Sequence, residues 1–253
     1  MKITRAVVPS LFTVLNIVSG FLAIMHASAG RIELGAWFIV LAAVFDSMDG
    51  IMARITRSSS QFGVELDSLA DVVSFGAAPS FLAYKACLSS LGTAGLIISA
   101  VPLVFGAIRL ARFNVQLIGF EKDYFKGLPI PFAAITICAF VLQFYTQEYG
   151  FSDWTGAGFA AMIVFLGLLM VSRVRYDTLP KFTSRGVKAH PWRAIAFSVA
   201  VVIVISSAGR LFFAVLLTFI LFGVIRSTAD WIRRMITPRR EQDEDAELTS
   251  IDI

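Results

Sequence analysis

Long apolar runs separated by short polar stretches follow one another from residue 8 to residue 230. A helix needs roughly 20 mostly apolar residues, at about 1.5 Å per residue, to cross the hydrocarbon core of a bilayer. By this criterion the sequence predicts eight spans, at 8–28, 34–53, 66–88, 94–113, 130–147, 156–172, 193–209 and 211–230. The last two leave room only for a tight turn at Gly209 and Arg210. We therefore expect an all-α integral membrane protein.

The composition supports this fold class. Hydrophobic residues make up 57% of the chain and charged residues 16%, whereas soluble domains carry roughly 25% charged residues. The two cysteines, Cys87 and Cys138, both lie in apolar segments, which excludes a disulfide framework and a cysteine metal site.

The basic residues indicate an orientation. Nineteen of the 22 Lys and Arg residues fall in the segments that lie on the same side as the N-terminus, so both termini are expected in the cytoplasm. The net charge of +4 is therefore a topology signal, and no nucleic-acid partner is expected. Residues 1–230 should form one transmembrane domain, and residues 231–253 a basic, then acidic, cytoplasmic tail that is partly disordered.

Four aspartates lie inside predicted spans. Asp46 and Asp49 are three residues apart near the inner end of the second span, and Asp67 and Asp71 are four apart at the start of the third. Each pair shares one helical face, and a short turn would bring the two faces together. Because four clustered carboxylates repel one another, protons or cations must neutralise them. Oxygen ligands without His or Cys favour a hard divalent ion: Mg²⁺, Mn²⁺ or Ca²⁺.

Residues beside the aspartates suggest a phosphate ligand. Gly50, Ala53 and Gly63 lie on the same faces as the acids, and absent or small side chains let a ligand approach the backbone. Arg54 follows at the membrane surface, where a guanidinium can donate two hydrogen bonds to phosphate. Together these residues predict a pyrophosphate-binding site.

The spacing of these eight residues, from Asp46 to Asp71, resembles the signature of the CDP-alcohol phosphatidyltransferase family. The resemblance implies a six-helix core with additional C-terminal helices, a homodimer, and transfer of a phosphatidyl group from a CDP-linked lipid to an alcohol with release of CMP. It further implies that Asp46, Asp49, Asp67 and Asp71 bind the metal, that Asp71 is the general base, and that Gly50, Ala53, Arg54 and Gly63 contact the CDP-lipid.

Four further segments resemble the membrane-integral, serine-using branch of the family: PSLFTVLNIVSGFLAI, RLARFN, GLPIPFAA and VSRVRYDTLPKF. The implied substrates are CDP-diacylglycerol and L-serine. Candidates for the acceptor pocket are Arg109, Arg112, Asn114 and Lys126, although the basic residues among them also fit the positive-inside pattern.

Alternative functions remain open at this point. The acceptor could be glycerol 3-phosphate, inositol phosphate or choline with the same chemistry. A membrane prenyltransferase also uses intramembrane aspartate pairs but would not need the glycine and arginine pattern. A cation transporter would need polar residues through the whole membrane, whereas the outer halves of the second and third spans are largely apolar.

Overall fold

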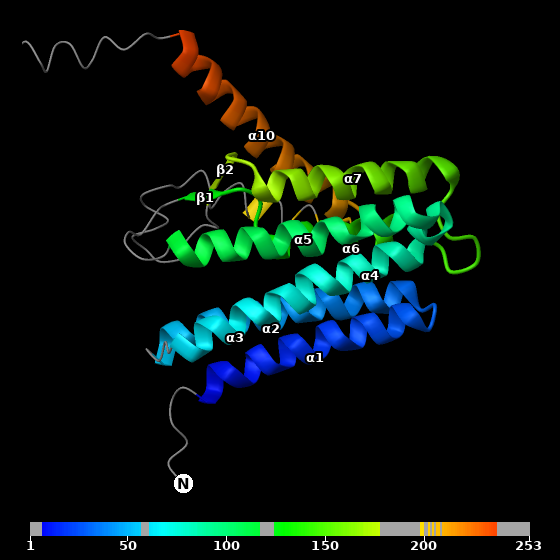
Figure 1. Cartoon of the computed structure of the whole chain (residues 1–253), viewed down its shortest axis with the longest axis horizontal. Helices are drawn as coiled ribbons and strands as arrows, with labels where there is room; N and C mark the ends of the chain where they lie inside the picture. Colours follow the sequence, from blue (N-terminus) through cyan, green and yellow to red (C-terminus); the bar gives the residue numbers. More distant parts are fainter. Residues whose placement is uncertain are drawn as a thin grey trace, which may run out of the picture.

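The computed structural model describes residues 7–56, 61–116, 124–177 and 209–236, and single positions between 198 and 207. The described chain is a bundle of long helices running side by side (Figure 1). Its helices are α1 (Val7–Ser28), α2 (Ile32–Thr56), α3 (Gln61–Asp71), the π-helix η1 (Val72–Ala77), α4 (Ala78–Ala86), the 3₁₀ helix η2 (Leu88–Leu91), α5 (Gly92–Gln116), α6 (Ile130–Phe144), α7 (Asp153–Val171) and α10 (Phe212–Ile236).

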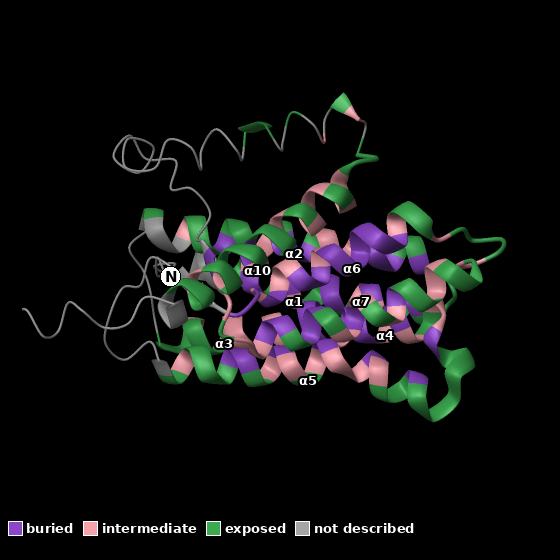
Figure 2. Ribbon diagram, turned by 90° about the horizontal axis from the view of Figure 1, so that it is seen from above, coloured by how far each residue is buried: buried purple, intermediate pink, exposed green. Residues whose placement is uncertain are grey.

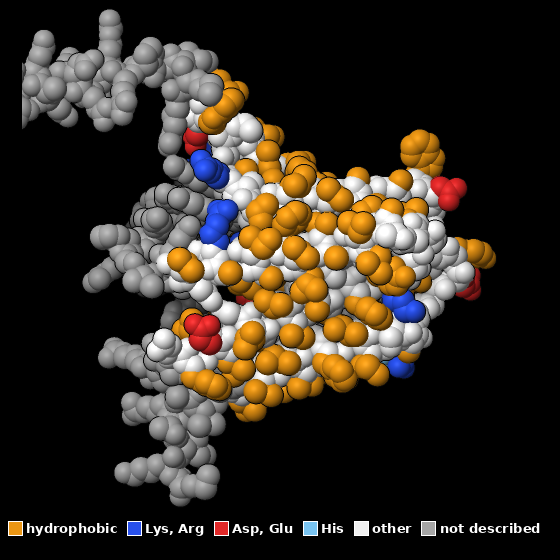
Figure 3. Space-filling view, in the orientation of Figure 1, with side chains coloured by type: hydrophobic (Ala, Val, Ile, Leu, Met, Phe, Trp, Pro, Cys, Tyr) orange, Lys and Arg blue, Asp and Glu red, His pale blue; other side chains and the backbone are white. Residues whose placement is uncertain are grey.

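Five described helical segments are long and apolar enough to cross a membrane: Leu11–Ser28, Ile32–Met52, Leu88–Val115, Asp153–Val171 and Phe212–Arg233. Ile130–Phe144 is a shorter apolar helix. In Figure 3 hydrophobic side chains cover the middle of the visible face, and charged side chains gather toward its two ends. This distribution is typical of a protein that has lipid as solvent around its waist.

The helix bounds agree with most of the predicted spans. The third predicted span, 66–88, is built from three consecutive elements, α3, η1 and α4. Ten of the seventeen residues of the span predicted at 193–209 lie outside the described residues. A turn does follow it, since Gly209 has a φ of 81° and its N–H donates to the carbonyl of Val204. The last helix continues to Ile236, six residues beyond the predicted end.

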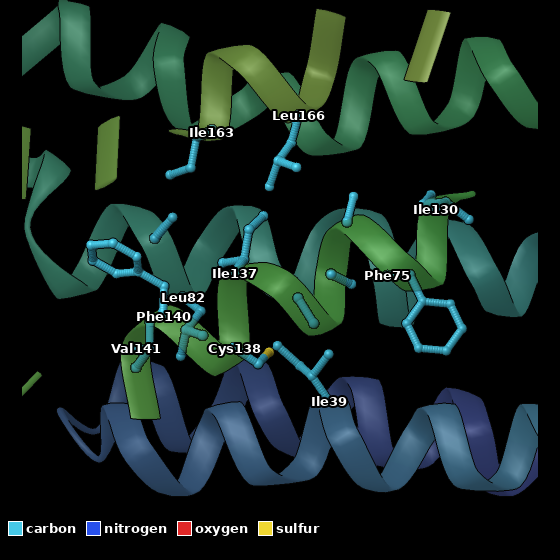
Figure 4. Close-up of a cluster of buried hydrophobic side chains, with 14 of the residues drawn as sticks. Ile39, Phe75, Leu82, Ile130, Ile137, Cys138, Phe140, Val141, Ile163 and Leu166 are labelled. Atoms are coloured by element: carbon cyan, nitrogen blue, oxygen red, sulfur yellow. The ribbon is translucent and has the colours of Figure 1, made fainter. Parts of the chain in front are cut away.

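The apolar core is centred on α6, which lies between α1 and α2 on one side and α5 and α7 on the other (Figure 4). The helices are coloured as buried on the faces turned toward the inside of the bundle and as exposed on the faces turned outward (Figure 2). Ile137 and Cys138 of α6 are fully buried among residues such as Ile39, Leu82 and Ile163. Close helix packing relies on small residues: a Cβ on Gly167 of α7 would stand 2.1 Å from a methyl of Val101 in α5.

Proline inside α5 has a compensating contact. Pro102 cannot donate a backbone hydrogen bond, and its ring disturbs the preceding turn. The next N–H, of Leu103, donates to the hydroxyl of Ser80 in α4 at 3.1 Å. Because lipid offers no replacement partner, such a side-chain acceptor lets the proline stay within the bundle.

The described chain is all-α in class, as expected, and it carries one short pair of strands beside its helices. Strands β1 (Tyr124–Lys126) and β2 (Arg175–Asp177) pair antiparallel, with Phe125 opposite Tyr176. They belong to the two longer stretches between predicted spans, 114–129 and 173–192. The strands are only three residues long, and each depends on a partner far away in sequence, so no local pattern announced them.

Gly127 attaches this strand pair to the bundle. Its φ of 80° is strained for any residue with a side chain, and a Cβ there would lie 2.2 Å from the carbonyl oxygen of Met170. Its N–H donates to Val174, and the N–H of Leu128 donates to Leu169 at the end of α7. Pro129 then serves as the N-cap of α6. The GLPIP segment thus connects the strand pair to the start of α6 and the end of α7.

Candidate active site

The aspartates lie where α2 ends and α3 begins, at the end of the bundle that also carries the strand pair of β1 and β2. We call this the acid end; it is at the left in Figure 1. Asp46 and Asp49 belong to the last turns of α2, and Asp67 and Asp71 belong to α3. Each pair lies on one face of its helix, as the spacing predicted.

Three of the four carboxylates converge. One oxygen atom each of Asp46, Asp67 and Asp71 lie within 4.8 Å of one another. In the same cluster, Oδ1 of Asp71 is buried and has no hydrogen-bond partner. Three mutually repelling carboxylates at this range need a cation or protons between them. The oxygen-only donor set therefore fits a hard divalent ion such as Mg²⁺ or Mn²⁺.

Asp49 stands slightly apart from this group of three. It is only 7% exposed, and its Oδ2 accepts a hydrogen bond of 2.6 Å from the hydroxyl of Thr13 in α1. Its Oδ1 is buried without a partner. Its charge still acts on both Asp46 and Asp67, so it belongs to the same electrostatic cluster.

A π-helix begins directly after Asp71. Turns of this kind are rare and occur frequently at functional sites, because the wider turn changes the phase of the helix. Before the π-helix, α3 presents Asp67 and Asp71 to α2; after it, Ala78 and Leu82 of α4 are buried in the apolar core. The hydroxyl of Ser74 donates to the carbonyl of Asn16 at 2.9 Å, which attaches the π-helix to α1. Nothing in the sequence pattern predicted this change of phase.

The predicted CDP-lipid contacts flank the acids. Gly50 is exposed beside Asp49, and Gly63 lies partly exposed one turn before Asp67. Ala53 and Arg54 belong to the last turn of α2, and their side chains lie outside what the structure describes. The described positions are compatible with a ligand approaching the backbone at this end of the bundle.

The acceptor candidates separate into different environments. Arg109 of α5 is buried, its guanidinium carbon lies 6.0 Å from the centre of the Phe113 ring, and its charge interacts with that of Asp71. Its Nε atom is buried without a partner. Arg109 is thus a buried cation facing the acids, with one donor unused.

Other candidates already have structural partners. Arg112 is exposed and donates to the carbonyl of Val171, the last residue of α7, at 3.2 Å. Asn114 donates to the hydroxyl of Ser68, next to Asp67, at 2.9 Å. Lys126 lies in β1 opposite Arg175, and its side chain lies outside the described residues. Binding of an acceptor by these three stays a prediction.

Sequence reasoning missed two residues of α1. Thr13 and Asn16 are buried at 2% and 0% exposure, and they belong to a stripe that continues through Gly20, Ala23 and Ala27. The signal was present as polar residues three apart on one face of an apolar span. It gave no indication of which helix that face would meet.

Comparisons with known proteins agree with this site. A family model described as CDP-alcohol phosphatidyltransferase matches residues 6–225. The CDP-diacylglycerol–serine O-phosphatidyltransferase of Helicobacter pylori is 41% identical over 174 residues, which cover 68% of this chain and 73% of the relative. The archaetidylserine synthase of Methanothermobacter thermautotrophicus is 38% identical over 178 residues, covering 69% of this chain and 72% of the relative.

A solved structure has the same fold. It is the phosphatidylinositol phosphate synthase of Mycobacterium tuberculosis with CDP-DAG bound, which matches with a TM-score of 0.51 and 20% identity. The match covers 67% of this chain and 82% of the other. The family match spans most of the sequence, and it includes both acid-bearing helices. This chain therefore belongs to the CDP-alcohol phosphatidyltransferase family.

Proposed function

We propose that this enzyme transfers the phosphatidyl group of CDP-diacylglycerol to the hydroxyl of L-serine, giving phosphatidylserine and CMP. The observation that carries the proposal is the convergence of Asp46, Asp67 and Asp71 from two helices at one end of the bundle. Family membership supports the reaction class, and relatives named for serine transfer, at up to 41% identity, support the acceptor.

The four aspartates have a common first task. Asp46, Asp49, Asp67 and Asp71 would hold divalent metal, Mg²⁺ or Mn²⁺, which when bound neutralises negative charge on the two phosphates and on the departing CMP. Gly50, Ala53, Arg54 and Gly63 would contact the nucleotide and its phosphates. Because these residues hold the reacting groups in place, direct attack needs no covalent intermediate on the protein.

Asp71 would act as the general base. It lies deeper in the bundle than Asp67, and its Oδ1 is without a hydrogen-bond donor. A carboxylate in this position can accept the proton from the serine hydroxyl as the oxygen attacks the phosphorus atom attached to diacylglycerol. The phosphate bond to CMP then breaks, and CMP leaves.

Arg109 is the strongest candidate for recognition of serine. Free serine carries a carboxylate that a guanidinium can bind with two hydrogen bonds. Arg109 is buried, its positive charge interacts with the carboxylate of Asp71, and its Nε donor has no hydrogen-bond partner. A carboxylate held there would bring the serine hydroxyl toward the general base.

We also propose a cytoplasmic location for the acid end. The positive-inside bias of nineteen residues supports this orientation. It places the site where CDP-lipid and serine meet, with acyl chains in the bilayer and the nucleotide at its surface. The single domain over 1–230, the tail over 231–253 and the homodimer implied by the family resemblance stay predictions.

An acceptor screen tests the function. Purified protein in detergent receives CDP-diacylglycerol, Mn²⁺ and one acceptor at a time: serine, glycerol 3-phosphate, inositol phosphate or choline. We expect CMP release and a new lipid with serine, and loss of both when EDTA removes the metal. A product with one of the other acceptors and none with serine would contradict the proposal. Parallel reactions with a CDP-activated ether lipid address the lipid class, because one relative is an archaetidylserine synthase.

A further inference from the structure

α1 meets both acid-bearing helices, although none of the acids belongs to it. Thr13 donates to Asp49 of α2, and the carbonyl of Asn16 accepts from Ser74, three residues after Asp71. Because α1 and α2 run antiparallel, the step of one turn from Thr13 to Asn16 matches the step from Asp49 back to Asp46. Each step covers about 4.5 Å along the helix axis. Asn16 thus lies at about the depth of Asp46 along the bundle.

The side chain of Asn16 is unusual for a bilayer-spanning helix. It is completely buried, and neither its Oδ1 nor its Nδ2 has a hydrogen-bond partner. A buried carboxamide without partners costs roughly 1–3 kcal/mol by mutational measures, and lipid offers no water to replace them. Packing alone would favour an apolar residue of similar size at this position.

Thr13 makes the complementary contact. A metal-binding carboxylate is commonly oriented by a second residue that hydrogen-bonds its other oxygen, and loss of that residue typically lowers metal affinity or activity 10- to 100-fold. The hydroxyl of Thr13 occupies Oδ2 of Asp49 and leaves Oδ1 unpaired. The hydrogen bond from Thr13 holds Oδ2 of Asp49 in place and thereby orients Oδ1.

We propose that α1 supplies the supporting layer of the metal site. Thr13 is a positioning residue that orients Asp49, and Asn16 is a polar group whose Nδ2 amide donates to a carboxylate of the acid cluster when a divalent cation is bound. The inference rests on the proposed metal-dependent function, because it describes how the same site is held. It accounts for both the buried unpaired carboxamide and the hydrogen bond between Thr13 and Asp49.

Direct titration of Mn²⁺ onto the full-length, detergent-purified protein, followed by electron paramagnetic resonance, tests the proposal without turnover. We expect Thr13→Val to weaken Mn²⁺ binding about 10- to 100-fold, and Thr13→Ser, which keeps the hydroxyl, to restore it. Thr136→Val is a matched control, because Thr136 is also fully buried and its hydroxyl donates only within α6 to Phe132. It should bind Mn²⁺ as the unaltered protein does.

Asn16→Ala distinguishes a binding role from a structural one. We expect it to weaken Mn²⁺ binding while the unfolding temperature of the metal-free protein stays the same or rises, since an unpaired polar group is removed. In the double variant with Thr13→Val and Asp49→Asn, the losses should not add, because both changes act on one carboxylate.

Each failure has a separate meaning. If the unaltered protein binds Mn²⁺ and both the Thr13→Val and Asn16→Ala variants bind it equally well, the supporting role of α1 is wrong and the proposed function stands. If the unaltered protein does not bind Mn²⁺ at all, the metal site itself is contradicted. Additive losses in the double variant would contradict the assignment of Thr13 to Asp49.

Discussion

The middle of the bundle and the acid end are both buried, yet they are built differently. Around α6, apolar side chains such as Ile137 fill the space between four helices, and Phe140 stacks on Phe159 at 5.1 Å. At the acid end, buried polar atoms lack partners. Among the described residues such atoms occur in Asn16, His26, Asp49, Asp71, Arg109 and Tyr176, and all but His26 lie at the acid end.

This contrast separates stability from function. A core without unpaired polar groups contributes to folding, whereas buried unpaired groups cost free energy unless a ligand, an ion or water pairs with them. Proteins commonly accept such local cost at functional sites. Changes in the middle should therefore lower stability with little effect on chemistry, and changes to the unpaired polar groups at the acid end should do the reverse.

The largest expected effect is on chemistry. Asp71→Asn removes the proposed base and should lower the rate of CMP release by roughly 10²- to 10⁴-fold. The unfolding temperature should not fall, because the carboxylate has an unpaired buried oxygen. Asp153→Asn, at the opposite end of the bundle in the first turn of α7, is the control. Turnover near the normal rate in the Asp71 variant would remove the general-base assignment.

A core change should act on stability. Ile137→Ala deletes part of a fully buried side chain and should lower the free energy of unfolding by roughly 2–5 kcal/mol. At a temperature where the variant is folded, its turnover should be close to normal. Ile97→Ala is the comparison, since Ile97 is 63% exposed on α5 and loses few contacts. Equal destabilisation of the two variants in thermal unfolding would argue against a core centred on α6.

Arg109 tests specificity within the acid end. Arg109→Met should raise the KM for serine roughly 10- to 100-fold, the equivalent of losing hydrogen bonds to a charged group. The KM for CDP-diacylglycerol should change much less. Arg112→Gln should have little influence on either value, because Arg112 already donates to Val171 at the end of α7. Steady-state kinetics with each substrate varied in turn would show equal changes in both KM values if Arg109 held only the fold.

The smallest expected effect concerns the attachment of the strand pair to the bundle. Gly127→Ala places a Cβ against the carbonyl of Met170 and forces a side chain into positive φ, which should cost about 1–3 kcal/mol. Gly158→Ala in α7 meets open space and should be neutral or stabilising. Thermal unfolding of the two variants compares them directly. Loss of stability in both variants would show that helix packing, rather than the attachment of the strand pair at Gly127, determines the change in unfolding temperature.

Local pattern was sufficient for the spans and the acids. Apolar runs determine helices in lipid because each helix satisfies its own backbone hydrogen bonds, so length and hydropathy predicted α1, α2, α5, α7 and α10 closely. The spacing of Asp46, Asp49, Asp67 and Asp71 placed each pair on one helical face. The acids of the candidate site were therefore predictable from the sequence.

Tertiary structure decided how those faces meet. The hydrogen bond from Thr13 to Asp49 and the isolation of Asn16 depend on the packing of α1 against two other helices. The strand pair joins residues about fifty positions apart, and the π-helix after Asp71 alters the phase that a regular helix would have. Such features arise from contacts between segments distant in sequence, and helical periodicity carries no information about which partners a face will find.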